Sequence, residues 1–290
     1  MPLISVGMPV YNGERYLAAA IESVLAQTDD NFELIIADNA STDGTAEICA
    51  AYAARDSRIV VHRNETNIGA AGNYALLVDL ARAPYFRWSN ADDLLAPELH
   101  ALCLKALQDN PDAVLSHGKT MLIDESDAEL GAFDDNMHIV DGDPVQRLQK
   151  FFESYRLTNA IYGLMRTDAV RKTNIFGDGA LPAGDISFMA ELVLLGCFVE
   201  LPEQLFFRRM HPESSSHDRG DDARQKQFWA ASQSSFRLPI LRQTGRYLKY
   251  VWAADDLRGS KLRTSTYLLR RLVWQRSAVL REVMASVRTG

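Results

Sequence analysis

The chain has 290 residues, of which 47% are hydrophobic and 24% charged, and its formal net charge is −7. This composition is ordinary for a globular protein with a large core, and the acidic balance argues against general nucleic-acid binding. Without a signal-peptide pattern or an apolar run of ~20 residues, we expect a cytoplasmic protein. Its three cysteines, Cys49, Cys103 and Cys197, lie far apart among apolar residues, so we expect buried free thiols.

Strand-like and helix-like segments alternate through the first third of the chain. Apolar runs predict strands over residues 3–11, 32–38, 59–62 and 84–89. Apolar residues at 3.6-residue spacing predict helices over 14–27 and 70–83, and a third from a Ser41 or Thr42 cap to about residue 54. This alternation predicts an α/β fold with a mainly parallel central sheet and helices on both faces.

Small polar and acidic residues follow each of the four predicted strands. They are Tyr11 and Asn12, Asp38 and Asn39, residues 64–73, and residues 90–93. In open α/β sheets, ligands bind beyond the carboxyl ends of the strands. The four strand ends therefore predict one binding site at a single edge of the sheet.

The remaining elements are predicted in the same way. We expect a helix over 97–109, a strand over 113–118, an exposed irregular stretch over 124–143, a helix over 144–155 and a strand-like segment over 159–165. A glycine-rich loop over 176–184 precedes an apolar helix over 186–195, and strands are expected over 198–201 and 204–210. Residues 213–222 are polar, and two or three basic amphipathic helices extend to residue 290.

The acidic residues at the strand ends are candidate ligand-binding groups. Adjacent carboxylates such as Asp92 and Asp93 repel one another unless a cation lies between them, and Mg²⁺ or Mn²⁺ takes carboxylates together with phosphate oxygens. The alternative is a solvated pair before the next helix. Asp38, at a strand end, can accept hydrogen bonds from a nucleotide base or ribose, and its alternative role is an Asx-turn or helix cap. Tyr11 suits stacking on a base, or else the core.

Two later residues are candidates for chemistry. Asp185 heads an apolar helix, which suits a general base for an acceptor hydroxyl and equally suits an N-cap. His211 follows Arg208 and Arg209 at a strand end, where a diphosphate would fit, although a lone histidine is more often structural.

Several segments resemble a known family. Residues 4–14 read ISVGMPVYNGE and residues 32–45 read FELIIADNASTDGT, with Asn-Ile-Gly at 67–69 and Asn-Ala-Asp-Asp at 90–93 downstream. Together they strongly resemble the inverting family 2 glycosyltransferases of the GT-A fold. The resemblance is specific over about residues 1–120, looser over 180–212 and absent from the basic tail.

The resemblance implies a nucleotide-diphosphate-sugar donor, a carbohydrate or lipid-linked acceptor, and Mg²⁺ or Mn²⁺ as cofactor. It implies that Asp185 is the catalytic base and that Asp92, Asp93 and His211 hold the metal. The implied nucleotide-sugar-binding residues are Pro9, Tyr11, Asn12, Glu14, Asp38, Asn67, Asn73 and Asp92. Two positions depart from the family pattern, because Asn39 and Asn90 stand where the family usually has aspartates.

Two other functions remain open at this stage. A sugar nucleotidyltransferase would use a similar platform, but residues 9–13 lack its glycine-rich triphosphate loop with a basic residue. An inactive nucleotide- or glycan-binding homologue is the non-enzymatic alternative, and Asn39 and Asn90 favour it.

We expect a GT-A domain over residues 1–215, with a nucleotide-sugar half (1–120) and an acceptor half (121–215), and a basic helical extension over 216–290. Residues 236–290 carry twelve Lys or Arg and three Asp or Glu, a net +9, which leaves −16 for the preceding 235 residues. Basic helices with aromatic residues suit peripheral contact with an anionic inner membrane face. Packing on the body or in a homodimer is the alternative.

Overall fold

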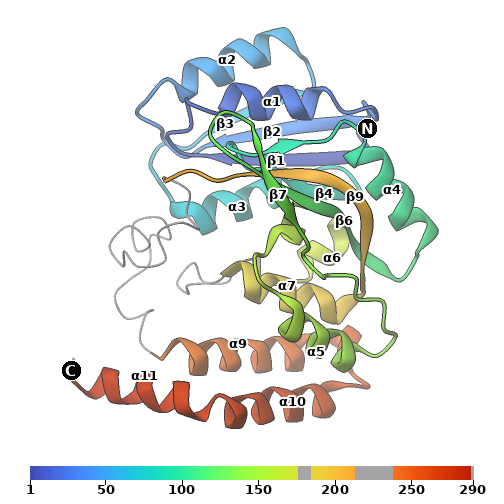
Figure 1. Ribbon diagram of the computed structural model, residues 1–290, viewed down its shortest axis with the longest axis vertical. Coiled ribbons are helices and arrows are strands. Elements are labelled where there is room, and N and C mark those ends of the chain that lie inside the picture. The colour runs from blue at the N-terminus through green and yellow to red at the C-terminus, as the bar shows by residue number, and fades with distance from the viewer. Residues whose placement is uncertain (176–183, 213–237, 289–290) are drawn as a thin grey trace.

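The computed structural model describes residues 1–175, 184–212 and 238–288. Within these residues, one nine-stranded sheet has the order β3-β2-β1-β4-β8-β6-β9-β5, and β7 pairs with β6 (Figure 1). The strands are β1 Ile4–Val10, β2 Phe32–Asp38, β3 Ile59–Arg63, β4 Tyr85–Trp88, β5 Leu94–Leu95, β6 Ala113–Ile123, β7 Glu129–Phe133, β8 Leu164–Arg166 and β9 Cys197–Arg209.

Strands β1 to β4 are parallel, which places their carboxyl ends at one edge of the sheet. The second half differs, because β8 is antiparallel to both β4 and β6, whereas β9 is parallel to β6. The expected α/β fold with a mainly parallel sheet is confirmed.

Helices cover both faces of the sheet (Figure 1). Their bounds are α1 Leu17–Leu25, α2 Thr45–Arg55, α3 Gly69–Leu80, α4 Leu99–Asp109, α5 Pro144–Ser154, α6 Thr167–Arg171, α7 Gly184–Leu195, α9 Pro239–Ala253, α10 Lys261–Trp274 and α11 Arg276–Arg288, with 3₁₀ turns η1 Asn159–Tyr162 and η3 Asp255–Leu257. Alternate residues of β2 pack into two separate cores: Leu34 and Ile36 join the core containing α1 and α4, and Ile35 joins the core containing α3 and α7.

Close packing at β1 depends on a residue without a side chain. A Cβ atom at Gly7 would lie 2.9 Å from the Cβ of Leu77 on α3 and 3.0 Å from the ring of Phe86. The helix thus approaches the strand that leads into the expected binding site, and it fixes the position of that strand.

Some local predictions were wrong. Residues 124–143 were expected to be irregular and exposed, but β7 pairs with β6 here, and Asp135, Met137 and Ile139 are buried. Residues 159–165 begin as the turn η1, and residues 197–209 form one continuous strand where two were expected. Neither Ser41 nor Thr42 caps α2, whose N-cap is Gly44. The segments 176–183 and 213–222 lie outside the described residues.

The C-terminal helices pack against the body of the protein. Tyr247, Tyr250 and Val251 of α9 and Leu268 of α10 lie in the same core as the apolar side chains of α7. At this contact, Arg246 Nε lies 3.5 Å from the buried carboxylate of Glu191. In Figure 1 the three helices form a layer on the side of the molecule farthest from α1 and α2.

Two sequence-level expectations concern thiols and membranes. All three cysteines are free, with Cys49 and Cys103 buried and Cys197 half-buried. Among the described helices, none is both long enough and apolar enough to cross a bilayer.

Candidate active site

Two loops interlock at the carboxyl edge of the sheet. Asn12 follows β1 in the left-handed region, with φ of 51°. Its side-chain oxygen accepts a hydrogen bond from the Thr42 amide at 2.9 Å, and its own amide donates to Ser41 Oγ at 2.9 Å. The Glu14 carboxylate accepts from the Gly44 amide at 2.7 Å. These bonds hold the loop after β1 against the loop after β2.

Asp38 lies at the end of β2, directly beside the end of β1. The side chain is 1% exposed, and Oδ1 accepts from the Ser41 amide at 2.9 Å. Oδ2 lies 3.0 Å from Arg63 Nη1 at the end of β3, and the same guanidinium donates to the Ser41 carbonyl. In contrast, Tyr11 is 45% exposed, which leaves its ring free for stacking.

Four asparagines tie the loop after β3 to the end of β2. Asn39 donates to Asn67 at 2.8 Å and accepts from Asn64 at 3.0 Å. Asn64 also donates to Asn73, which in turn donates to the Ala37 carbonyl at 2.8 Å. Because Asn73 is 2% exposed and its amide is engaged in this way, Asn73 and Asn67 shape the loop that carries them.

Asp92 and His211 meet at the same edge although 119 residues separate them. His211 Nε2 lies 3.1 Å from Asp92 Oδ2. The Tyr16 ring packs against the imidazole with centroids 5.1 Å apart. The Asp92 side chain is 34% exposed, so a ligand can reach the carboxylate from solvent.

Asp93 has a different environment from its neighbour. It is 3% exposed, and its two oxygens accept from Asn90 Nδ2 and from the Arg209 amide, both at 2.8 Å. Burial, followed by the charge of Asp92, raises the pKa of Asp93 to about 7. Asp92 is therefore the more accessible of the two carboxylates for a metal ion, because both oxygens of Asp93 accept from protein donors and its side chain is buried. Asp93 instead connects the 90–93 loop to β9.

The two arginines before His211 lie in different environments. Arg209 is 3% exposed, donates to the carbonyls of Asp92 and Asp124, and pairs with Asp127. Successive residues of a strand point to opposite faces, so Arg208 points away from this cluster. Its guanidinium donates to Asn159 at the start of η1. Of these two arginines, Arg208 is therefore the more accessible to an anionic ligand, because it is half-buried whereas Arg209 is buried.

Asp185 lies in the first turn of α7 and interacts with Thr158. Burial raises the pKa of Asp185, while hydrogen bonds from the backbone of Ile186 and from Thr158, and the charge of Arg208, act in the opposite direction. The Arg208 charge also lowers the pKa of Asp93. The guanidinium of Arg208 thus acts electrostatically on both Asp93 and the candidate base Asp185.

The described residues contain no group of three or more His, Cys, Asp or Glu side chains arranged to hold a metal ion. Asp92 and His211 nevertheless offer a carboxylate oxygen and an imidazole nitrogen 3.1 Å apart. Mg²⁺ is typically bound by one or two carboxylates, with phosphate oxygens and water completing the octahedron. The Asp92 carboxylate can supply one such ligand to a metal that arrives with a diphosphate, with the His211 imidazole beside it.

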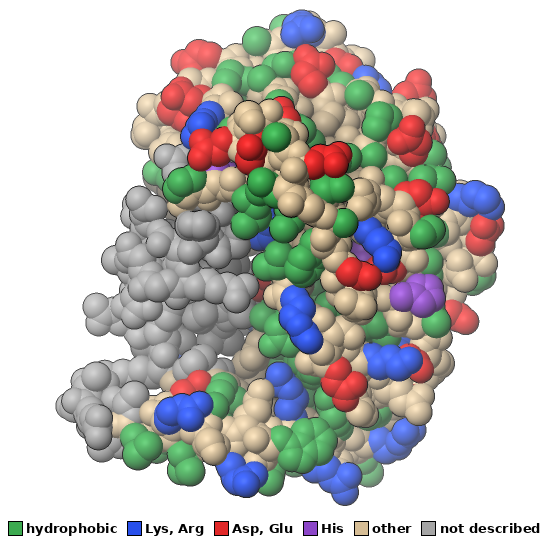
Figure 2. Space-filling view, in the orientation of Figure 1, with side chains coloured by type: hydrophobic (Ala, Val, Ile, Leu, Met, Phe, Trp, Pro, Cys, Tyr) green, Lys and Arg blue, Asp and Glu red, His purple; other side chains and the backbone are tan. Residues whose placement is uncertain are grey.

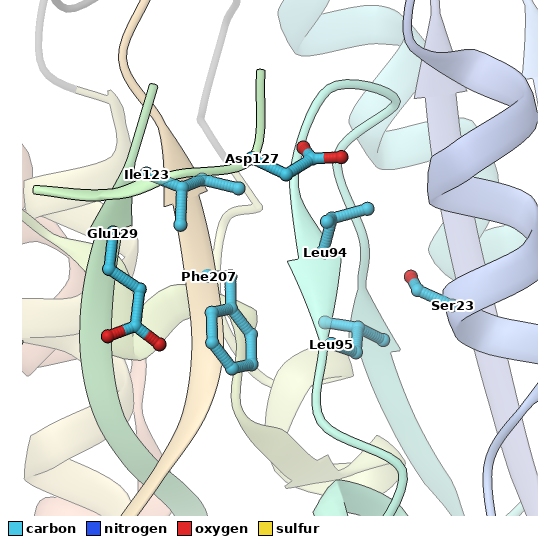
Figure 3. Close-up of a pocket in the computed structure, with 7 residues that line it drawn as sticks. All are labelled: Ser23, Leu94, Leu95, Ile123, Asp127, Glu129 and Phe207. Carbon is cyan, nitrogen blue, oxygen red and sulfur yellow. The ribbon is translucent and has the colours of Figure 1, made fainter. Parts of the chain in front are cut away.

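A separate pocket of about 230 Å³ lies beside strands β5 and β9. In Figure 3 the apolar side chains of Leu94, Leu95 and Phe207 face it from β5 and β9, with Asp127 and Glu129 nearby. None of the predicted site residues lines this pocket, so it is distinct from the polar edge that holds Asp92 and Asp185.

The family model for glycosyl transferase family 2 matches residues 5–177. The chain belongs to glycosyl transferase family 2. The resemblance seen in the sequence is thereby confirmed, and the match spans the strand ends that carry Tyr11, Asp38 and Asp92.

Curated relatives in this family share part of the chain. The glycosyltransferase GlyG of Streptococcus pneumoniae is 34% identical over 128 residues, which are 44% of this chain and 42% of that protein. The Escherichia coli chondroitin synthase is 26% identical over 264 residues, 87% of this chain and 36% of that enzyme. The chain thus covers less than half the length of both relatives.

Solved structures with the same fold include two nucleotide-sugar complexes. Staphylococcus aureus TarS 1–349 with UDP-GlcNAc superimposes with a TM-score of 0.64 at 16% identity, over 94% of this chain and 72% of that one. The mannosyltransferase PcManGT from Pyrobaculum calidifontis with GDP-Man and Mn²⁺ gives a TM-score of 0.53 at 14% identity. The match covers 100% of this chain and 76% of that one. At these identities the likeness establishes the GT-A fold of family 2.

Sequence reasoning missed several residues at this edge. Arg63 contacts Asp38, and Thr158 interacts with Asp185. Asn159 and Tyr74 contact neighbouring residues of the site, Arg208 and Asn90, and the Tyr74 hydroxyl donates to Asn90 at 2.7 Å. Arg63 directly follows a predicted strand, but Asn159 was placed at the start of a strand that the structure replaces with η1.

Proposed function

We propose that the protein is an inverting glycosyltransferase that moves a sugar from a nucleotide-diphosphate donor to a hydroxyl acceptor. The proposal is supported by the contact of Asp92 with His211 at the carboxyl edge of the sheet, and by the charge of Arg208, which lowers the pKa both of Asp93 and of the candidate base Asp185. A donor diphosphate beside Arg208 would direct the sugar toward Asp185.

In the proposed reaction Asp185 accepts the proton of the acceptor hydroxyl while that oxygen attacks C1 of the donor sugar. The C1–oxygen bond to the diphosphate breaks in the same step, so the configuration at C1 inverts. Burial among apolar residues of α7 raises the pKa of Asp185 and makes the carboxylate a stronger base.

The donor nucleoside is proposed to lie between the ends of β1 and β2. Tyr11 offers an exposed ring for stacking, Pro9 lines the strand end, and Asp38 accepts hydrogen bonds from the base or ribose. Asn12 and Glu14 hold the two loops together, and Asn67 and Asn73 hold the third loop. UDP, GDP and dTDP are the candidate nucleotides.

A divalent ion, Mg²⁺ or Mn²⁺, is proposed to bind between Asp92, His211 and the donor diphosphate. When bound, it supplies a positive charge that stabilises the leaving nucleoside diphosphate. Asn90 cannot add a charged ligand, and it hydrogen-bonds Asp93 instead.

The deciding experiment starts with a thermal-shift screen of UDP-, GDP- and dTDP-sugars with Mn²⁺, followed by an assay for the released nucleoside diphosphate. Asp185→Asn should lower turnover by roughly 10²–10⁴-fold while leaving donor affinity nearly unchanged, because only the general base is lost. Asp168→Asn is the matched control, since Asp168 lies exposed in the first turn of α6. Equal turnover in the Asp185→Asn variant would contradict the assignment.

The second candidate function is a nucleotide- or glycan-binding protein without transferase activity. The replacement of family aspartates by Asn39 and Asn90 favours it. Nucleotide binding in the screen without release of a nucleoside diphosphate, with or without sugar acceptors, would support this candidate over the enzyme.

We further propose that the protein works in the cytoplasm in polysaccharide or glycolipid assembly, with its C-terminal helices on an anionic membrane face. Five exposed apolar residues recur at spacings of seven and four along α10 and α11, so within each helix they lie on one side. They are Leu262, Leu269, Val273, Leu280 and Met284. The similarity to a chondroitin synthase supports polysaccharide assembly.

Charge favours a lipid surface over a second copy of the chain. Residues 238–288 hold eleven Lys or Arg and three Asp or Glu, and Arg263, Arg270, Arg276 and Arg281 flank the apolar stripe. Figure 2 shows blue and green side chains along these helices, whereas red side chains gather on the opposite half. Two such basic faces would repel one another, but anionic lipid would attract them.

Vesicle co-sedimentation tests this surface. The protein should bind vesicles of phosphatidylglycerol and phosphatidylcholine more than vesicles of phosphatidylcholine alone, and Leu269→Gln with Val273→Gln should abolish the difference. The control is Val60→Gln with Val61→Gln, a second exposed apolar pair, on β3. A concentration-dependent dimer that the same stripe variant dissolves would instead identify the stripe as a subunit interface.

A further inference from the structure

A buried chain of hydrogen bonds leads from the interior to Arg208. Thr120 Oγ1 donates to Asp135 Oδ2 at 2.8 Å, and Asn159 Nδ2 donates to Thr120 Oγ1 at 3.2 Å. Arg208 Nη1 then donates to Asn159 Oδ1. Asp135, Thr120 and Asn159 are each at most 3% exposed. The chain therefore runs through the protein interior without competition from solvent.

All donors in this chain point the same way, from Arg208 toward Asp135. An ionised carboxylate only accepts hydrogen bonds, so it takes the hydroxyl hydrogen of Thr120. The Thr120 oxygen is then left to accept, which turns the amide nitrogen of Asn159 toward it. The amide oxygen of Asn159 consequently faces Arg208. The polarity of the chain is thus determined by the residue at its buried end.

The carboxylate of Asp135 is buried at the inner end of this chain. Burial raises the pKa of Asp135 to about 7, and Oδ1 meets no hydrogen-bond donor among the described residues. A buried polar atom without a hydrogen-bond partner lowers the stability of the folded state. Asp135 is connected to the candidate active site through Thr120 and Asn159.

The opposite end of the chain lies at the acidic edge of the sheet. Arg208 is half-buried, and its charge lowers the pKa of Asp93 and that of Asp185. It is paired with Leu122 in the β6–β9 register, two residues beyond Thr120 on the same face of β6. Arg209 is committed to Asp92, Asp124 and Asp127. Of these two adjacent arginines, Arg208 is therefore the one whose guanidinium can serve the leaving group.

We propose that Arg208 binds the β-phosphate of the donor, and that Asp135 is a positioning residue that sets the guanidinium in place through Thr120 and Asn159. The inference rests on the proposed glycosyltransferase function. It adds a protein cation that neutralises the leaving diphosphate beside a metal site with only two protein ligands. Consequently, part of the diphosphate affinity does not depend on metal.

Calorimetry on the full chain at pH 8 with EDTA tests the proposal. The probes are UDP, GDP and dTDP, each compared with its nucleoside monophosphate. Arg208→Met should weaken diphosphate binding roughly 10-fold or more and leave monophosphate binding unchanged, because charged hydrogen bonds to the β-phosphate are lost. Thr120→Val and Asp135→Asn should show the same selective loss, smaller in size, and Thr120→Ser should retain wild-type affinity.

Two controls distinguish an effect on the position of Arg208 from a general loss of structure. Asp134→Asn changes the neighbouring carboxylate, which is exposed and pairs with Lys119 at 3.2 Å, and should have no effect. Adding Asp135→Asn to Arg208→Met should cause no further loss, since both act through one group. A wild-type protein that binds no diphosphate better than its monophosphate would overturn the proposal, as would equal weakening of both probes or full affinity in Thr120→Val.

A failure of the wider function has a different signature. Absence of sugar transfer, together with a diphosphate preference that Arg208→Met removes, would contradict the transferase and support the positioning chain. Normal sugar transfer, together with a diphosphate preference that Arg208→Met leaves unchanged, would support the transferase and contradict the positioning chain.

Discussion

Arg208 and Arg209 are adjacent, yet they serve opposite faces of β9. Arg209 is buried and holds the 90–93 loop, while Arg208 reaches toward η1 and Asp185. The sequence marked both only as basic residues near His211. Their separation follows from strand alternation within the predicted strand over residues 204–210, but the partners of each arginine on other elements had no signal in the sequence. Asp38 and Arg63 both lie at the ends of predicted strands, yet no residue pattern indicated that these two side chains would pair.

Asp185 should shape the pH dependence of the reaction. Burial raises the pKa of Asp185 above 3.8, and a general base works only when ionised. Activity should therefore be present at high pH and be lost as the pH falls through this raised pKa. Arg208→Met removes a charge that lowers the pKa, so the acidic limb of kcat/KM should move to higher pH. A pH–rate profile in which the limb stays in place would contradict this expectation.

The Asp135→Asn variant should be more stable than the wild type at pH 8, although it should bind the donor diphosphate less well. Since the folded-state pKa is raised from 3.8 to about 7, its contribution to the free energy of unfolding is fully present below 3.8 and is lost as the pH rises through 7. Asp135→Asn removes this loss, so at pH 8 the variant should melt about 2–4 °C higher for each kcal/mol regained. Thermal melts from pH 4 to 8 measure the difference, and a lower Tm at pH 8 would contradict it.

The loops and strands differ in how well the sequence predicts them. Strands β1 to β4 have strong apolar runs, so their positions were predicted to within one or two residues. Strand β7 was missed because its residues, such as Glu129 and Leu130, are exposed on a hairpin and carry no apolar alternation. The cap of α2 was missed because the polar residues before it bind the loop after β1.

The left-handed conformation at Asn12 gives a test of the interlocked loops. Asn12→Gly and Asn12→Ala both lose the bond to the Thr42 amide, but only alanine is strained at a φ of 51°. The alanine variant should therefore be less stable than the glycine variant by about 1–2 kcal/mol. Urea unfolding of the two variants measures this difference, and equal stabilities would show that the loop relaxes.

At the scale of the whole molecule, the C-terminal helices share a core with the body. Tyr247 and Leu268 pack with the α7 side chains, and Arg246 faces Glu191, which also accepts from Asn174 at 2.7 Å. The sequence indicated basic amphipathic helices, but it could not show that their apolar faces complete the core around α7. A long-range contact of this kind has no local signature.

Calorimetric unfolding should consequently show one cooperative transition for the body and the helices together. Deleting residues 238–290 should leave the apolar face of α7 and the charge of Glu191 uncovered and lower the yield of soluble protein. Two separate transitions, or a stable chain of residues 1–237, would show instead that the predicted extension is an independent unit.

The pairing of Asp92 with His211 also constrains when the protein becomes competent during synthesis. The two residues are 119 positions apart, and Asp93 accepts from the backbone of Arg209 across 116 positions. A ribosome that has released only the first half of the chain has exposed the strands proposed to bind the nucleoside, together with Asp92, but not His211. The nascent chain is thus unable to assemble the proposed metal site, and a sugar nucleotide meets that site only after β9 has joined the sheet.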